Sequence, residues 1–239
     1  MSNLLNLVVE AHGGLAQWNQ FTDLVTDVFA DGELCRQRNW SGIVPRSRLL
    51  LSLRTQRTVV LLPAGQGHIL IRPDLISHTD EHGAYLESLA HPRETMLREN
   101  SPMDWDLLRT AYFIGSAIRH SVTAPFLYTL PGFISEEVEP WEEDGETWRV
   151  LRILFPADFG APASLHFAYY GPDGRLRRTR NGIEMIGGLN LAEYVTSYEQ
   201  IDGIWMPTSN EVFACDPEGR KLDRPPLGRI AYVGSFLTN

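Results

Sequence analysis

The segment 165–186, with the sequence LHFAYYGPDGRLRRTRNGIEMI, places a short chain reversal between two stretches of strand-like length. Its turn, Gly171-Pro172-Asp173-Gly174, combines a proline with preset φ and a glycine that accepts positive φ, as tight hairpins require. Turns of this kind recur through the C-terminal half of the chain, at Asp144-Gly145, Gly187-Gly188, Asp202-Gly203 and Asp216-Pro217-Glu218-Gly219. This spacing predicts one curved antiparallel sheet, with about seven strands between Phe133 and Asn239.

Alternation typical of strands also fills the N-terminal part of the chain. From Leu24 the apolar period is two, and the segment 25–38 predicts a pair of strands around the turn Asp31-Gly32. The segments 45–54, 57–62 and 67–72 predict further strands, which makes about five in this meander. The expected fold class is therefore mainly β: residues 1–239 form a single domain with one curved antiparallel sheet, a half-open β-barrel of about 11–13 strands.

Two helical regions are expected beside the sheet. Residues 3–18 carry apolar side chains at helical spacing, and Gly13-Gly14 predicts a break within this N-terminal helix. A central helical insert covers residues 91–130. Within it, the segment Ser101-Pro102-Met103-Asp104 has the capping residue, proline and acid of a helix start, and an apolar stripe runs from Leu107 to Ile118.

Composition limits the possible partners and the compartment. The chain of 239 residues has 30 acidic and 21 basic residues, a net charge of −9, so a nucleic-acid partner is not expected. No stretch approaches the ~20 apolar residues of a bilayer span, so no membrane insertion is expected. The N-terminal residues do not follow the pattern of a signal peptide, which predicts a cytoplasmic protein. The oligomeric state cannot be predicted from these features.

Few residues have the spacing of a metal or cofactor site. Cys35 and Cys215 lie far apart and are expected to be reduced. His78 and His82 are four residues apart, but no third ligand accompanies them. The acid-dense segment 136–146 lacks an oxygen-ligand loop and is interpreted as a solvated hairpin edge. No phosphate loop and no Gly-x-Ser-x-Gly motif is found, so no metal and no cofactor is expected.

Three residues are candidates for acid–base chemistry. His120 follows the central helix, and His166 lies in a predicted strand among aromatic residues. Either imidazole could move a proton, because the reference pKa of histidine is about 6.5. Arg180 and Glu184 share one side of the predicted strand 175–184. They could pair inside a cavity and orient a ligand, with Glu184 as a further acid or base, or form an ion pair at the rim.

Aromatic residues are the main candidates for ligand contacts. They are abundant between Trp105 and Tyr198, and a curved sheet with a helix across its mouth can leave an apolar pocket. The residues expected to bind a ligand are Trp105, Tyr112, Tyr128, Trp148, Tyr169, Arg180 and Tyr194.

Several phrases resemble an uncharacterised bacterial family with the fold of the lipoprotein-localisation factors (LolA/LolB-like). The phrases are Ala11-His12-Gly13-Gly14 with Trp18, the segment 105–113, Thr123-Ala124-Pro125-Phe126-Leu127, the segment 141–148, Tyr170-Gly171-Pro172-Asp173-Gly174, Asp202-Gly203-Ile204 and Pro207-Thr208. The resemblance implies a half-barrel whose apolar cavity holds acyl chains or other apolar ligands. The chain differs from the periplasmic carriers of that superfamily, since it shows neither their signal peptide nor their lipobox cysteine.

Three functions are compatible with these features. The first is cytosolic binding of a hydrophobic small molecule, lipid-like or polyketide-like, in an aromatic-lined cavity. The second is a cofactor-independent enzyme of secondary metabolism, a cyclase, isomerase or lyase, which uses the same cavity. The third is a non-catalytic protein-interaction module that uses exposed sheet edges. A polar pair at the bottom of an open cavity would favour the enzyme.

Overall fold

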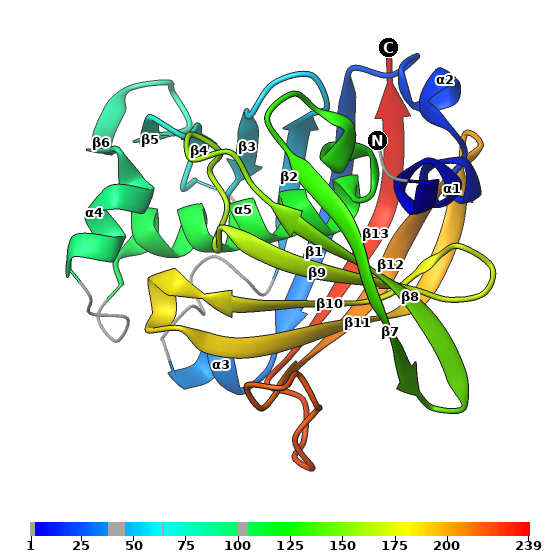
Figure 1. Cartoon of the computed structure of the whole chain (residues 1–239). Coiled ribbons are helices and arrows are strands. Elements are labelled where there is room, and N and C mark those ends of the chain that lie inside the picture. The colour runs from blue at the N-terminus through cyan, green and yellow to red at the C-terminus, as the bar shows by residue number, and fades with distance from the viewer. Residues whose placement is uncertain (1–2, 38–45, 64, 100–104) are drawn as a thin grey trace.

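One curved antiparallel sheet forms the body of the protein (Figure 1). The computed structural model describes residues 3–37, 46–63, 65–99 and 105–239. Within them, 13 strands are hydrogen-bonded in the order β6-β5-β4-β3-β2-β1-β13-β12-β11-β10-β9-β8-β7. The edge strands β6 and β7 do not pair with each other, so the sheet is an unclosed half-barrel. This confirms the mainly β fold class expected from the turn spacing.

The sheet consists of two meanders, each following the chain order. The first has the strands β1 (Asp23–Asp31), β2 (Ser47–Ser52), β3 (Thr58–Leu61), β4 (His68–Ile71), β5 (Leu75–Thr79) and β6 (Tyr85–Ala90). The second has β7 (Ile134–Glu143), β8 (Glu146–Leu154), β9 (Leu165–Tyr170), β10 (Leu176–Ile183), β11 (Leu189–Ile201), β12 (Ile204–Ala214) and β13 (Gly228–Thr238). The seven C-terminal strands agree with the prediction, whereas the N-terminal meander has six strands.

A single strand pair joins the two meanders. The first strand, β1, pairs with the last, β13, in a register that places Leu24 opposite Leu237 and Val28 opposite Tyr232. The side chains of these four buried residues therefore lie on the same concave side of the sheet at this junction.

The prediction of a strand pair around Asp31-Gly32 is wrong in its second strand. After β1 the chain forms the short helix α3 (Glu33–Gln37), and β1 pairs with β2 and β13 instead. Gly32 has a φ of 139°, and a Cβ there would lie 2.4 Å from the carbonyl oxygen of Leu227. The glycine thus permits a close backbone approach to the end of the β12–β13 connection and does not form a hairpin turn.

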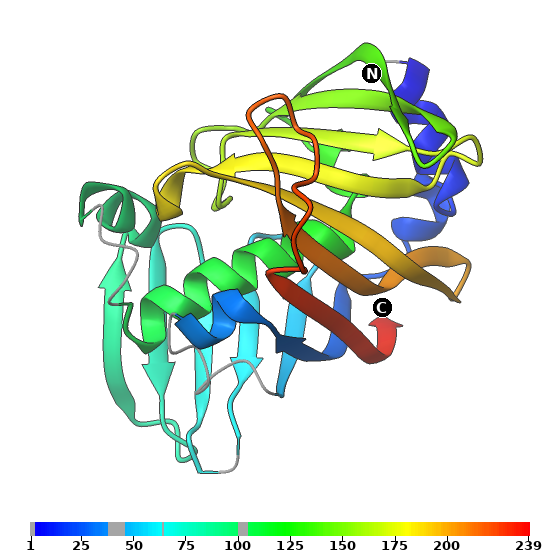
Figure 2. The ribbon, with the colours of Figure 1, turned by 90° about the horizontal axis from the view of Figure 1, so that it is seen from below.

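Helices occupy the concave side and one end of the sheet (Figures 1 and 2). The N-terminal region forms α1 (Asn3–Ala11) and α2 (Leu15–Trp18), separated at Gly13-Gly14 as predicted. The insert forms α4 (Pro92–Glu99), α5 (Leu107–Thr123) and the short 3-10 helix η2 (Phe126–Thr129). A second 3-10 helix, η3 (Glu184–Ile186), follows β10.

The start of the central helix differs from the sequence-based expectation. The predicted cap at Ser101–Asp104 lies outside the described residues. Within them, α5 begins at Leu107, and the carboxylate of Asp106 accepts a hydrogen bond of 2.9 Å from the Arg109 backbone N–H. Such an N-cap satisfies a donor that the helix itself cannot pair.

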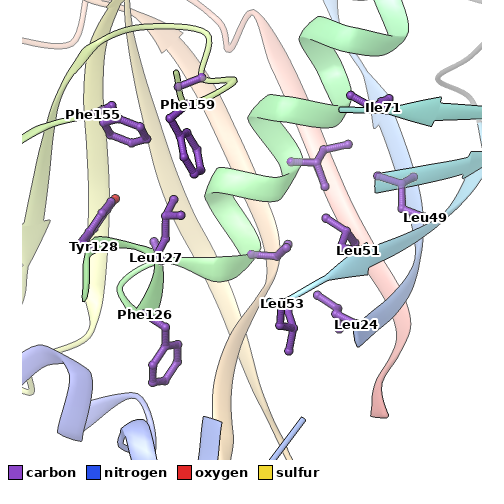
Figure 3. Close-up of a cluster of buried hydrophobic side chains, with 14 of the residues drawn as sticks. Leu24, Leu49, Leu51, Leu53, Ile71, Phe126, Leu127, Tyr128, Phe155 and Phe159 are labelled. Carbon is purple, nitrogen blue, oxygen red and sulfur yellow. The ribbon is translucent and has the colours of Figure 1, made fainter. Parts of the chain in front are cut away.

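Helix α5 packs closely into the trough of the sheet. A Cβ added to Gly115 would lie 2.4 Å from Cδ1 of Ile71 on β4, so the helix approaches the first meander more closely than an alanine allows. Figure 3 shows buried side chains around this helix from both halves of the chain. Trp18 stacks on Phe126, with ring centroids 4.3 Å apart, and anchors α2 to η2. The apolar core therefore joins the helices to both meanders.

The acid-dense hairpin β7–β8 is extensively ion-paired. Glu136 pairs with Arg152, Glu137 with Arg149, and Glu146 with Arg177, each with an N–O distance between 2.7 and 3.2 Å. Asp144 and Gly145 have positive φ values at the predicted turn. Arginines thus compensate much of the negative charge of the segment 136–146 within the sheet.

None of the helices in the described part of the chain combines the length and apolarity of a membrane span.

Candidate functional site

A cavity lies between α5 and the concave face of the sheet. Its volume is about 110 Å³, and most of its wall is apolar. Strands β1, β10, β11, β12 and β13 form the floor, and α3 contributes Leu34 and Cys35 at one side. The apolar side chains that form the wall include Phe113, Ile114, Ile118, Ile183, Leu191, Val212 and Ile230.

Secondary-structure periodicity directs these side chains to the cavity. Ile114, Ala117 and Ile118 lie on one face of α5, because residues three and four apart are neighbours on a helix. On β11, Leu191 and Glu193 alternate with Ala192 and Tyr194, so only the odd-numbered pair faces the cavity. The helical spacing on α5 and the alternation on the strands therefore determine which side chains form the wall.

One end of the cavity carries two histidines, both of which the sequence singled out. His120 from α5 and His166 from β9 line it together, with ring centroids 4.4 Å apart in an edge-to-face arrangement. His166 Nε2 donates to the Ala163 carbonyl oxygen at 3.1 Å, so Nδ1 accepts from the Asn181 side-chain amide, also at 3.1 Å. His120 Nε2 shares a hydrogen bond of 2.8 Å with the Tyr128 hydroxyl.

Both imidazoles are neutral at physiological pH. Burial lowers the pKa of His166 to about 4. Burial, together with the neighbouring His166, holds the pKa of His120 well below its ordinary value. A neutral imidazole pair can exchange hydrogen bonds with a polar ligand group, but it offers no positive charge to an anion.

A buried carboxyl group forms a second polar feature of the same cavity. Glu193 Oε1 accepts hydrogen bonds from Ser121 Oγ at 3.0 Å and from Asn210 Nδ2 at 2.5 Å. Asn210 is fully buried, and its Nδ2 also lies 2.7 Å from Ser121 Oγ. Burial raises the pKa of Glu193, although these two hydrogen bonds oppose the shift. The carboxyl group is thus held in an environment that favours its protonated form.

The rim of the cavity is polar and partly ion-paired. Asp31 and Arg229 lie there, opposite each other in the β1–β13 register. Arg229 Nε donates to Glu211 at 2.8 Å, and its side chain is 69% exposed. The charged groups therefore lie at the mouth, whereas the interior polar groups are the two histidines, Asn181 and Glu193.

The third predicted catalytic residue lies elsewhere. Glu184, in η3, pairs with Arg93 of α4 and accepts hydrogen bonds from Ser164. It does not pair with Arg180, whose guanidinium lies 4.3 Å from the centroid of the Phe167 ring. The predicted Arg180–Glu184 pair is therefore wrong, because the chain leaves the extended conformation at η3 and turns Glu184 toward α4.

Four of the predicted ligand-binding residues face the opposite, convex side of the sheet. Trp148, Tyr169 and Tyr194 pack together there, around the fully buried Arg178. Arg180 is two residues further along the same side of β10. We correct the expectation that these side chains line the cavity: strand alternation puts His166, Asn181 and Glu193 on the concave face and their neighbours on the other.

The remaining three predicted aromatic residues lie in or next to α5 but do not line this cavity. Tyr128 reaches it only through its hydrogen bond to His120. Trp105 packs against Phe113, with ring centroids 5.1 Å apart. Tyr112 borders a different, more polar pocket with Asp74, His91 and Arg93, and burial raises its pKa to about 12.

Sequence reasoning missed the cluster of Glu193, Ser121, Asn210 and Asn181. A signal for Glu193 exists, because the acid occurs at the apolar positions of an alternating strand, between Leu191 and Val195. Ser121 similarly follows Ile114 and Ile118 on the apolar face of the helix. In the described residues, no group of three or more His, Cys, Asp or Glu side chains could hold a metal.

Solved structures with the same architecture identify the fold. The chain superposes on a LolA superfamily protein from Nitrosomonas europaea with a TM-score of 0.53 and 10% identity, over 97% of this chain and 92% of that one. The fold is LolA-like. A DUF1329 family protein from Desulfovibrio piger is similar, with a TM-score of 0.50 and 10% identity, over 98% of this chain and 91% of that one. No protein-family model and no curated protein matches the sequence.

Proposed function

We propose that the protein binds a small hydrophobic molecule in the cavity beneath α5. The observation that carries this proposal is an apolar cavity of about 110 Å³ between helix and sheet, with a few uncharged polar side chains in its interior. An engineered cavity of about 150 Å³ binds benzene, so a space of this order holds one ring or the end of a longer apolar chain. Apolar walls with a few convergent polar groups are typical of small-molecule sites. The LolA-like half-barrel supports the same function by analogy.

A matched pair of cavity variants tests this function. Ethylbenzene is titrated into the protein, and binding is followed by ligand-observed NMR. Val212→Phe places a ring in the cavity wall and should weaken binding by at least about tenfold, because the ring takes the ligand's volume. Val233→Phe, at a 51% exposed position on β13, is the control and should bind as the unaltered protein does. Absent binding, or equal binding by both variants, would contradict the proposal.

The second candidate is a cofactor-independent enzyme that acts in the same cavity. One observation favours it: Glu193 and the pair His120–His166 line one cavity, and their pKa values are shifted in opposite directions. A protonated carboxyl group beside a neutral imidazole can give and take a proton at neutral pH, as an isomerase, cyclase or lyase requires. Turnover of a bound substrate that survives alanine at His120, His166 and Glu193 together would exclude this role.

The cytosolic location stays a prediction from the N-terminal sequence. Fractionation of cells that express the full chain, with detection in the soluble cytosolic and the periplasmic fractions, tests it directly.

A further inference from the structure

Glu193 has one engaged and one free carboxyl oxygen. Both hydrogen bonds that the carboxyl group accepts, from Ser121 and from Asn210, end on Oε1. Within the described part of the chain, Oε2 has no hydrogen-bond partner. This oxygen is not fully buried, so it remains accessible from the cavity. Since Glu193 lines the cavity, Oε2 is the oxygen that remains for a ligand. Its two donors fix the carboxyl group from α5 and β12, so the position of Oε2 is defined by the fold.

Among the described residues that line the cavity, none places a positive charge in the interior beside Glu193. His120 and His166 are neutral, as their lowered pKa values require. Burial, together with the nearby Glu193 carboxyl group, raises the pKa of the Tyr128 and Tyr232 phenols, so both stay uncharged. The charged groups of the cavity, Asp31 and Arg229, belong to its rim. An ionised ligand group would therefore enter the interior without a counter-charge, at a high desolvation cost.

A neutral Glu193 offers a hydrogen-bond donor. Because Oε1 accepts two hydrogen bonds, the proton of the neutral form resides on Oε2. A carboxylic acid kept neutral in an apolar site acts as a donor to oxygen acceptors. The adjacent walls are formed by the apolar side chains of Ile118, Leu191 and Val212. The rest of the ligand must therefore be apolar to fit against them.

We infer that the cavity selects an apolar molecule with an uncharged oxygen acceptor, a carbonyl or hydroxyl group, which binds at Oε2 of Glu193. This inference rests on the proposed binding function and adds the chemical class of the ligand. Free fatty-acid anions and phosphate esters are excluded from the interior, whereas ketones, aldehydes, esters and alcohols with a small apolar body are accepted.

Three probes of similar size separate the contributions of the apolar body, the oxygen acceptor and the negative charge to binding. Ethylbenzene has no acceptor, acetophenone adds a carbonyl oxygen, and benzoate carries a negative charge. Their affinities are measured at pH 7 for the unaltered protein, Glu193→Leu and Glu193→Gln. The ratio of acetophenone affinity to ethylbenzene affinity should fall by about three- to tenfold in Glu193→Leu, the value of one neutral hydrogen bond. Benzoate should bind the unaltered protein at least about tenfold more weakly than acetophenone.

The glutamine variant keeps the test valid if the leucine variant does not fold. A glutamine side chain can place its carbonyl oxygen toward Ser121 and Asn210 and its N–H₂ toward the ligand, so Glu193→Gln should retain the acetophenone preference. Raising the pH should ionise Glu193 and abolish the preference in the unaltered protein, but not in the glutamine variant. A preference that persists in both proteins at high pH, or in Glu193→Leu, overturns the inference.

The outcomes also separate this inference from the proposed function. If ethylbenzene binds and acetophenone shows no Glu193-dependent gain, the cavity binds apolar molecules but Glu193 does not select them. If benzoate binds as tightly as acetophenone, the selection against anions is wrong. If none of the probes binds, the binding function itself fails, and this inference fails with it.

Discussion

His120 on α5 and His166 on β9 meet edge to face, with ring centroids 4.4 Å apart, in the wall of the cavity beneath α5. The contact joins the central helix to the second meander through two neutral rings. Because each ring is buried, protonation of either one places a charge in an apolar environment next to the other imidazole. The pair therefore makes the stability of the fold depend on pH.

Acid should destabilise the protein between pH 6.5 and pH 4. Burial lowers the pKa of His12 and of His166 to about 4, and that of His120 well below its ordinary value. In this range the unfolded chain binds protons that the folded chain does not, so the free energy of unfolding rises with pH and levels off above about pH 6.5. A shift from 6.5 to about 4 corresponds to roughly 3 kcal/mol for one histidine. Glu193 contributes the opposite sign, since its raised pKa favours the folded state at low pH and loses that contribution as pH rises above about 4.3.

Urea unfolding at several pH values measures this dependence. His166→Gln should reduce the slope of the free energy of unfolding against pH by about one proton between pH 5 and 6. His82→Gln is the control, because that side chain is 82% exposed. A stability that does not change between pH 7 and pH 5 would show that these histidines are not buried as neutral rings.

Gly115 and Ile71 should show an energetic coupling. Gly115→Ala places a methyl group 2.4 Å from Ile71 Cδ1, so the end of the Ile71 side chain must shift, at a cost of about 0.5–1.5 kcal/mol that the higher helix propensity of alanine partly offsets. Ile71→Val removes that Cδ1 and alone costs about 0.5–1.5 kcal/mol. The double variant should be more stable than the sum of the two costs predicts, and denaturant unfolding of the four proteins gives the coupling. Strict additivity would mean that α5 does not approach β4 this closely.

Arg178 should be the most costly convex-face side chain to remove. It is fully buried, pairs with Glu143 at 2.7 Å and donates to the Gly219 carbonyl oxygen. Arg178→Met should destabilise the protein by about 3–5 kcal/mol, because it breaks the pair and leaves Glu143 without its arginine in a largely buried position. Arg152→Met, which removes an exposed pair with Glu136, should cost less than about 1 kcal/mol. Equal thermal shifts for the two variants would contradict a structural role for Arg178.

Glu184→Gln should leave ligand binding in the cavity unchanged. Glu184 is paired with Arg93 and Ser164 and does not line the cavity, so its loss affects only the contacts of η3 with α4 and with Ser164. The affinity for ethylbenzene should remain within about twofold of the unaltered protein, and the stability cost should be under about 1 kcal/mol. A large loss of binding would place Glu184 in the functional site, as its position in the sequence first suggested.

The sequence predicts what local patterns determine. The turns Asp144-Gly145 and Asp202-Gly203 need positive φ at both positions, and the structure has them where the sequence placed the hairpins. The break at Gly13-Gly14 and the seven strands after Phe133 follow from similar local rules. In contrast, α3 was missed because a strand-like segment after Gly32 becomes helical only where the chain meets the β12–β13 connection.

The site is less predictable, because its contacts are distant in the sequence. Ser121 and Glu193 are 72 residues apart, and no pattern at either position indicates the other. His120 and His166 were selected by residue type, and only the fold shows that they touch. Aromatic residues such as Tyr169 and Tyr194 could be assigned to a face of the sheet only after the concave face of β9 and β11 was known.

The pairing of β1 with β13 means that the junction between the two meanders is made by strands from opposite ends of the chain. Such a pairing is of high contact order, so we expect it to form late in folding. The cavity lies across this junction, since Ala30 of β1 and Ile230 of β13 both line it. A bound ligand would contact both meanders and stabilise their junction. Binding should therefore slow the hydrogen exchange of the β1 and β13 backbone amides.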